Sequence, residues 1–412
     1  MKFLCLLGAA LLCFAANAHA QLKTIQPKSS AATSDALGSP GIDAGGYVYV
    51  SGQGPRRLDG NTPSSFADQV RQSLENVRTI VEAAGLTMEH VVYVQVYLDD
   101  MSHYDALDKA FAEYFPKLPP ARGVLGVARL PEPSVQINAV AVRDLKEKQA
   151  VTVPQFRPSK AYSAGMLTHD RLFVSTMLGS DLANGNVPAN PAAQVDFALD
   201  RLKMVLEAAG LTLGNMVFVN PYLTSEIPSR IMNEHYARRF EFGNTPGRAT
   251  IEVSSLPEGA HIAYTGVAVR DLAQRQAIRP KNMPPSPTAS PCVFAGDTLY
   301  CSAKSGFIPG PNGGVFAAST ADQVRQTMRN LLDNLEEAGM KFDQVVSTTI
   351  YLDDLSDSAA FGKVYGKYFG AVLPAQTTVQ QIKPSDRKAD EEGHYPDLEQ
   401  VSLIAVRSSA KN

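Results

Sequence analysis

Apolar residues recur at helical spacing between positions 65 and 85. Steps of three and four residues separate the members Phe66, Val70, Leu74, Val77 and Val81. Such spacing places apolar side chains on one face of a helix, and the glycine at position 85 is typical of a helix end. The pattern therefore predicts an amphipathic helix over 65–85.

Strict alternation follows in 90–100, where valines and a leucine alternate with tyrosine and glutamine, and this predicts a strand. A second helical pattern lies in 102–115, and further strands are predicted in 47–52, 123–130 and 134–142. The expected order is β-β-α-β-α-β-β. This is an α+β unit in which both helices can cover one face of a sheet.

The sequence contains three copies of this unit. The phrase EAAGLT at 82–87 returns at 207–212, and EEAGMK stands at 336–341, so the period is about 125 residues. A period of that length has the size of a domain. We predict three homologous domains, joined by short linkers such as the proline-rich segment 279–287, with the bounds 22–148, 154–275 and 285–409.

The first twenty residues have the pattern of a signal peptide. Lys2 precedes an apolar run at 3–16, and Ala-His-Ala at 18–20 is a small-x-small cleavage site. The alternative is a membrane anchor, but the run is short for a bilayer. We expect cleavage before Gln21 and export to the periplasm or the medium. No later stretch has the apolar length of a membrane span, so no membrane association is expected afterwards.

Two cysteines remain after that cleavage, Cys292 and Cys301, in the stretch CVFAGDTLYC. A two-residue turn at Gly296 and Asp297 would place them opposite each other in a non-hydrogen-bonded pair, where Cα atoms are closest. A cross-strand disulfide and two free buried thiols both fit this pattern.

Composition excludes several classes of function. The formal charge is −3 and the basic residues are dispersed, which disfavours a nucleic-acid partner. The histidines are scattered and form no metal-binding motif, so we expect no metal site. Outside the predicted signal peptide they are His90, His103, His169, His235, His261 and His394.

Several phrases together resemble the RidA (YjgF-type) family of enamine/imine deaminases. They are VSGQGP at 50–55, the helix ending in EAAGL, the strand ending in YLDD, PPAR at 119–122 and the final INAVAVRDL. The resemblance implies a chorismate-mutase-like fold, a mixed sheet with two helices on one face. It also implies homotrimers with ligand clefts between subunits. Three copies in one chain suggest a monomeric pseudo-trimer, although each copy could instead trimerise with other chains.

The implied reaction is hydrolysis of 2-imino acids to keto acids and ammonia, without a cofactor. The family's carboxylate-binding arginine corresponds to Arg122 and Arg248, whereas the third copy has Gln376. A guanidinium binds a carboxylate in a bidentate manner, and a neutral amide has no such fork. We therefore expect small 2-keto or 2-imino carboxylates in two clefts and none in the third.

Other family positions are only partly retained. The serine of the SGQ phrase corresponds to Ser51, Ser175 and Ser302, and a tyrosine thirteen residues earlier is present only as Tyr162. Gly38 and Ala289 occupy the tyrosine's position in the other copies. Because Tyr162 and Ser175 belong to the same copy as Arg248, we expect Arg248 to matter more than Arg122.

The catalytic glutamate of the family is absent. Alignment on the AVAV phrase puts Asn138, Thr265 and Ser402 at its position, and none of them can act as a base at neutral pH. Deaminase activity is therefore expected to be weak or altered. A non-catalytic binding or scaffold protein on the same fold is the alternative. Ribonuclease activity is disfavoured by the acidic balance.

Overall fold

A computed structural model describes residues 22–28, 37–281, 283–310 and 313–407. The predicted signal peptide, residues 1–20, and its cleavage site lie outside these residues. Among the helices of the described part, none combines the length and the hydropathy that crossing a bilayer requires.

The first domain matches the predicted order of elements. Its two helices are α1 (Phe66–Ala83) and α2 (Tyr104–Tyr114). Strands β4 and β5 run parallel, and the other neighbouring strands are antiparallel. The sheet has the order β1 (Lys23–Ile25), β2 (Gly41–Asp43), β3 (Tyr47–Gln53), β6 (Val135–Val142), β4 (Val91–Leu98) and β5 (Ala121–Gly126).

The second domain repeats this topology. Its helices are α3 (Pro191–Ala208) and α4 (Ser229–Ala237). Its edge strand is divided into two short pieces, β11 and β12, which both pair in parallel with β10. The strands are β7 (Gln149–Val151), β8 (Gly165–Leu167), β9 (Arg171–Leu178), β10 (Met216–Leu223), β11 (Gly247–Arg248), β12 (Ile251–Glu252) and β13 (Ile262–Val269).

The third domain has the helices α5 (Thr320–Glu337) and α6 (Ser358–Tyr365). Strands β7 and β14 correct the predicted domain bounds, because each segment expected at or beside a linker is instead the first edge strand of the domain that follows. The strands of this sheet are β14 (Arg275–Ile278), β15 (Cys292–Ala295), β16 (Thr298–Ser305), β17 (Val345–Leu352), β18 (Ala375–Gln380) and β19 (Glu399–Val406).

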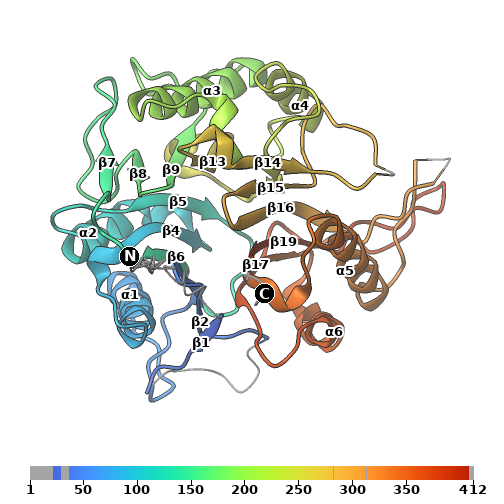
Figure 1. Cartoon of the computed structure of the whole chain (residues 1–412), viewed down its shortest axis with the longest axis horizontal. Coiled ribbons are helices and arrows are strands. Elements are labelled where there is room, and N and C mark those ends of the chain that lie inside the picture. The colour runs from blue at the N-terminus through green and yellow to red at the C-terminus, as the bar shows by residue number, and fades with distance from the viewer. Residues whose placement is uncertain (1–21, 29–36, 282, 311–312, 408–412) are drawn as a thin grey trace, which may run out of the picture.

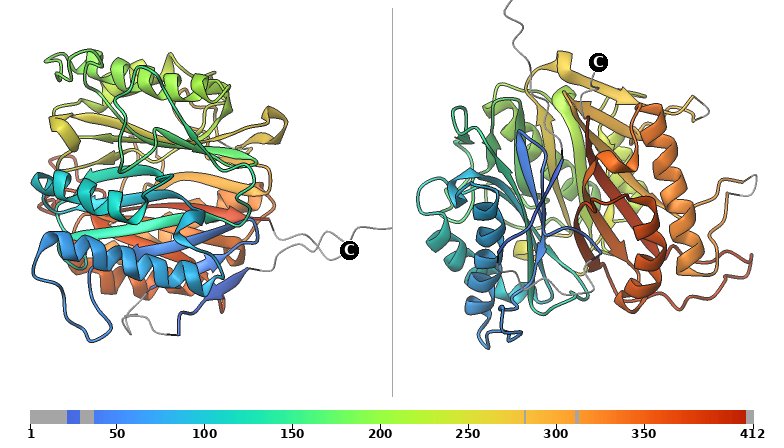
Figure 2. Two further views of the ribbon diagram at one scale, coloured as in Figure 1. Left: turned by 90° about the vertical axis from the view of Figure 1, so that its left-hand side faces the viewer. Right: turned by 60° about the horizontal axis from the view of Figure 1, so that its bottom comes forward.

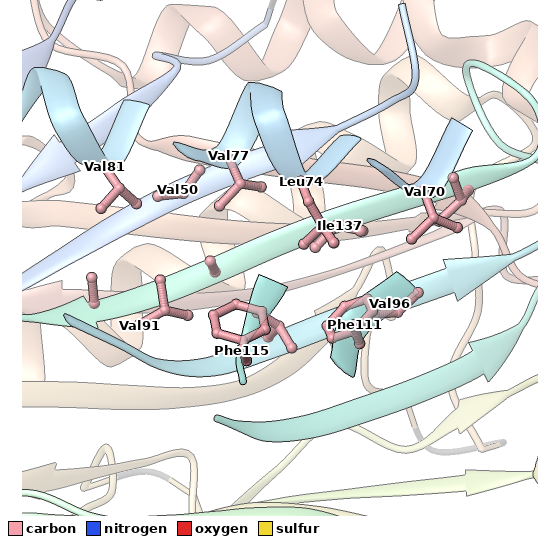
Figure 3. Packing of buried hydrophobic residues seen from close by; sticks show 14 of the residues in the cluster. Val50, Val70, Leu74, Val77, Val81, Val91, Val96, Phe111, Phe115 and Ile137 are labelled. Carbon is pink, nitrogen blue, oxygen red and sulfur yellow. The ribbon is translucent and has the colours of Figure 1, made fainter. Parts of the chain in front are cut away.

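Each helix pair covers the outer face of its own sheet, as α1 illustrates (Figure 3). Val70, Leu74 and Val77 have no exposed surface, and they pack in one cluster with Val50 and Ile137 of the sheet. Ser65 caps the helix by accepting a hydrogen bond from the Asp68 backbone N–H. The helix predicted from apolar spacing is therefore confirmed.

The three domains close into a ring, with the sheets inside and the helix pairs outside (Figures 1 and 2). One backbone hydrogen bond recurs at all three junctions, from a serine N–H of one domain to a proline carbonyl of the domain before it in the ring. The pairs are Ser163 with Pro120, Ser290 with Pro246, and Ser39 with Pro374, at 3.1, 3.1 and 3.0 Å. The last of these joins the third domain back to the first.

Cys292 and Cys301 form a disulfide across the β15–β16 hairpin. They are direct partners in the register, and Gly296 has the positive φ that the turn requires. Of the two alternatives left open by the sequence, the structure has the disulfide.

Candidate functional site

The domains of the ring meet at three junctions, each between an edge strand of one domain and a central strand of the next. We name the junctions after the ligand clefts expected there: the first cleft (β5 against β9), the second cleft (β11 against β16) and the third cleft (β18 against β3). Every cleft therefore combines residues from two domains. The residue that corresponds to the family arginine is supplied by the edge strand.

In the first cleft, the guanidinium of Arg122 is enclosed and already paired. Its side chain is only 1% exposed and forms an ion pair with Asp108 of α2. The aromatic side chains of Phe111 and Tyr162 both lie 4.9 Å from the guanidinium carbon. Asp108 is thus the carboxylate partner of Arg122, and Tyr162 packs against the same guanidinium.

Tyr162 and Ser175 contact Arg122. This corrects the expectation that they would lie in the same cleft as Arg248. Tyr162 stacks on Arg122, and the Ser175 hydroxyl accepts a hydrogen bond of 2.7 Å from the Arg122 backbone N–H. The reason is the order of the ring. Each cleft takes its arginine from one domain and its tyrosine position from the next, so residues of one sequence copy belong to different clefts.

In the second cleft, Arg248 has the same position on its edge strand as Arg122 in the first cleft, but its side chain has different neighbours. Its Nη1 donates to the amide oxygen of Asn233 at 2.7 Å, and its guanidinium carbon lies 5.2 Å from the aromatic side chain of Tyr236. Burial lowers the pKa of Arg248. Among the described residues, no carboxylate forms an ion pair with this guanidinium, so a desolvated cation is left without a counter-ion.

The family serines of the first two clefts have structural partners. Ser302 accepts from the Arg248 backbone N–H at 2.8 Å and donates to the Ser290 carbonyl at 2.6 Å, and Ser175 is bonded in the same way. Ser51 differs, because its hydroxyl donates to the Pro40 carbonyl at 2.9 Å and accepts from the Gln53 amide at 2.8 Å, and both partners belong to its own domain. Ser175 and Ser302 therefore form hydrogen bonds between neighbouring domains, whereas Ser51 lines an open space.

That open space is a cavity of about 440 Å³ in the third cleft. Gln376 of β18 forms part of its wall, and so do Ser358 and Phe361 of α6. Gly38 stands where the first cleft has Tyr162. A Cβ atom at Gly38 would lie 2.7 Å from both the Gln376 Cβ and the Pro374 carbonyl oxygen, so only glycine fits there. The cleft without an arginine on its edge strand thus contains an open cavity.

The residues aligned with the family glutamate do not lie in the clefts. Asn138, Thr265 and Ser402 line a separate cavity of about 110 Å³ where the three sheets meet. Residues two apart on a strand share a face, and the earlier one, Gln136, lines the third cleft instead. The alignment with the family glutamate therefore needs to be shifted by two residues toward the N-terminus. The shifted positions, which share one register, are Gln136, Ala263 and Gln400.

Sequence reasoning missed the helix residue that faces each arginine, Asp108 in α2 and Asn233 in α4. Neither belongs to a repeated phrase. Alignment of the two helices on Phe111 and Tyr236, each of which packs against its arginine, would have placed them three residues earlier in both copies. Within the described ranges, no group of histidine, cysteine and acidic residues could hold a metal ion.

A family model described as Endoribonuclease L-PSP matches residues 29–143, 153–269 and 282–384. The chain belongs to this family. The three matched segments correspond to the three domains of the ring. The third match ends before β19, at the start of the polar stretch 383–398 that the other L-PSP copies lack.

L-PSP relatives of this chain have the length of one domain. A RutC family protein of Pyrococcus horikoshii is 38% identical over 111 residues, which cover 26% of this chain and 86% of that protein. The 2-iminobutanoate/2-iminopropanoate deaminase of Escherichia coli K12 is 38% identical over 108 residues, covering 25% of this chain and 84% of the relative. The crystal structure of the Escherichia coli YjgF gene product is 36% identical, covers 30% of this chain and 99% of that chain, and has a TM-score of 0.28. Deaminase names among these relatives support imine/enamine deamination as the family-level function.

Proposed function

We propose that this protein binds small 2-keto and 2-imino carboxylates in the second cleft, with Arg248 as the anchor. The supporting observation is a partly buried guanidinium that has no carboxylate partner within the part of the chain that the structure describes. A desolvated charge that lacks a counter-ion is costly, and an anionic ligand would remove that cost. Asn233 accepts from one guanidinium nitrogen and leaves the others for the ligand.

The first cleft supports this role less well. A ligand there would have to displace Asp108 from Arg122 and move Tyr162. Because the internal carboxylate is held on the same chain, its effective concentration is far higher than that of a free ligand. Arg122 is therefore proposed as a structural counterpart of Arg248, although both were expected to bind.

Hydrolysis in the second cleft would depend on Gln400, at the register position of the cleft-facing residue. Its amide can orient a water molecule, but it cannot take the proton that a glutamate would take. We accordingly propose slow deamination of 2-imino acids. A purely ligand-binding protein is the second candidate, favoured by the absence of a carboxylate at Gln136, Ala263 and Gln400.

Calorimetric titration with pyruvate tests the binding proposal. We expect one site per chain in the wild type and a tenfold to hundredfold loss of affinity in Arg248→Gln, since a hydrogen bond to a charged group contributes about 1.5–3 kcal/mol. Gln376→Ala is the matched control in the third cleft. Unchanged pyruvate affinity in Arg248→Gln would overturn the proposal. Ammonia release from freshly generated 2-iminobutanoate then separates slow deaminase from binding protein.

We also propose that the protein is exported and works as a monomeric pseudo-trimer. The pattern of residues 1–20 supports export, and the Cys292–Cys301 disulfide suits an oxidising compartment. Intact-mass analysis of the exported protein should show a chain that begins at Gln21. Light scattering should give the mass of one chain, and a mass of three chains would contradict the monomer.

A further inference from the structure

The third cleft contains two hydrogen-bond acceptors for which the described residues provide no donor. The Oε1 atoms of Gln136 and Gln376 are both buried without a hydrogen-bond partner among the described residues, and both side chains line the cavity of about 440 Å³. Gln136 is 7% exposed. A buried acceptor without a donor is destabilising, so native proteins normally provide one.

The charges of this cleft cancel each other. Its cation, Arg56, is paired with its anion, Glu132, through Nε and Oε1 at 2.9 Å, and the Arg56 backbone N–H also donates to Glu132. The rest of the polar wall consists of amides and hydroxyls. A carboxylate ligand would therefore be desolvated there without gaining a counter-ion.

Small residues shape the cavity around these amides. A Cβ atom at Gly52 would lie 2.8 Å from the carbon of the Gln136 side-chain amide, so glycine leaves room for that amide. Gly38 leaves room for the Gln376 Cβ atom rather than for its amide. The Gln376 amide nitrogen donates to Thr378 at 2.8 Å. This contact leaves Oε1 as the atom of the Gln376 amide that still needs a partner.

We infer that the third cleft is a second ligand site, which takes an uncharged small molecule with N–H donors, of the carboxamide or urea class. The ligand N–H groups would donate to the orphan oxygens of Gln136 and Gln376 after rotation of these side-chain amides toward the cavity, because neither oxygen has accessible surface in this structure. Phe361 would cover the apolar part of the ligand. This site is separate from the Arg248 site, so either proposal can fail without the other.

Three probes of nearly the same shape test the inference by ligand-observed NMR titration. Pyruvamide has N–H donors, N,N-dimethylpyruvamide has none, and pyruvate has a charge instead. Pyruvamide should bind the wild type at least tenfold more tightly than the dimethyl compound. Gln136→Met and Gln376→Met should each weaken pyruvamide at least tenfold, because methionine is a similarly long, unbranched side chain without a strong acceptor.

Two further variants keep the result interpretable. Arg248→Gln should leave pyruvamide binding unchanged, and its loss of pyruvate binding reports only on the second cleft. Gln376→Arg introduces the residue that the fold accepts at this position in the other copies, and it should exchange pyruvamide binding for pyruvate binding in the third cleft. Equal binding of the two amides, no pyruvamide binding, or pyruvamide affinity that Gln376→Arg leaves unchanged would overturn the inference.

Discussion

The first and second clefts are built from the same elements and carry the same arginine, yet among the described residues only Arg122 has a carboxylate partner. In the first cleft the residue on the facing helix is Asp108, which pairs with Arg122. In the second cleft it is Asn233, which binds Arg248 without neutralising it. The exchange of an oxygen for a nitrogen on that side chain decides whether the guanidinium needs an external anion.

This difference shows that the arginine phrase alone does not define a carboxylate site. The phrase places a guanidinium at the junction of two domains, and the neighbouring helix determines its counter-ion. The chain thus contains one cleft that is closed by its own carboxylate, one that is charged, and one that is open but neutral.

The largest effect is expected where the second cleft lacks a base. Gln400→Glu should raise ammonia release from 2-iminobutanoate, on the order of 10²-fold, because a positioned general base typically contributes about 10²–10⁴-fold. The matched variant in the first cleft, Ala263→Glu, should give no increase, since Arg122 is occupied. A rise in Ala263→Glu but not in Gln400→Glu would reverse the comparison between the clefts.

A smaller effect is expected when the second cleft is given the helix residue of the first. Asn233→Asp should place a carboxylate on Arg248 and lower pyruvate affinity about tenfold, comparable with the loss of one charge-assisted hydrogen bond. Calorimetric titration provides the measurement. Tighter pyruvate binding in Asn233→Asp would show that an internal carboxylate does not compete for the guanidinium.

The reverse exchange should weaken the fold and open a site. Asp108→Asn leaves Arg122 buried without a counter-ion, so the free energy of unfolding should fall by about 1 kcal/mol. The decrease is modest because the Asp108 side chain is itself 34% exposed. Thermal unfolding should show a lower Tm than in the wild type. Pyruvate should restore part of that loss and should titrate two sites. A single site in Asp108→Asn would mean that Tyr162 keeps the first cleft closed.

The smallest effect concerns the third cleft. Gln376→Ala should leave pyruvate affinity within about twofold of the wild type, because a neutral amide contributes no counter-ion. Titration of pyruvate into this variant, beside Arg248→Gln, gives the test. A large loss in Gln376→Ala would place the carboxylate in the neutral cleft.

Most of the fold could be predicted from the sequence, because periodic burial is a local signal. Apolar spacing located α1 and the central strands, and the repeated phrases gave three domains. The bounds near residues 149 and 275 were missed because β7 and β14 are short edge strands with little apolar pattern. Their place is determined by pairing with the next domain, which is a tertiary effect.

The site could be predicted only in part, because each cleft joins two copies of the sequence. The arginines were found from their phrase, but Tyr162 was grouped with Arg248 rather than with Arg122, which lies across the junction. Alignment on the AVAV phrase placed Asn138 at the position of the family glutamate, whereas the residue that lines the third cleft is Gln136, two residues earlier on the same strand face. Nothing in a linear pattern shows which of two residues on one face reaches a cavity.

A crystal structure of the wild-type protein soaked with 2-oxobutanoate tests the central claim most directly, since all three clefts are present in each molecule. The account predicts the carboxylate on Arg248, with the Arg122–Asp108 pair intact and no carboxylate beside Gln376. A ligand on Arg122 with Asp108 displaced, while the second cleft remains empty, would contradict it.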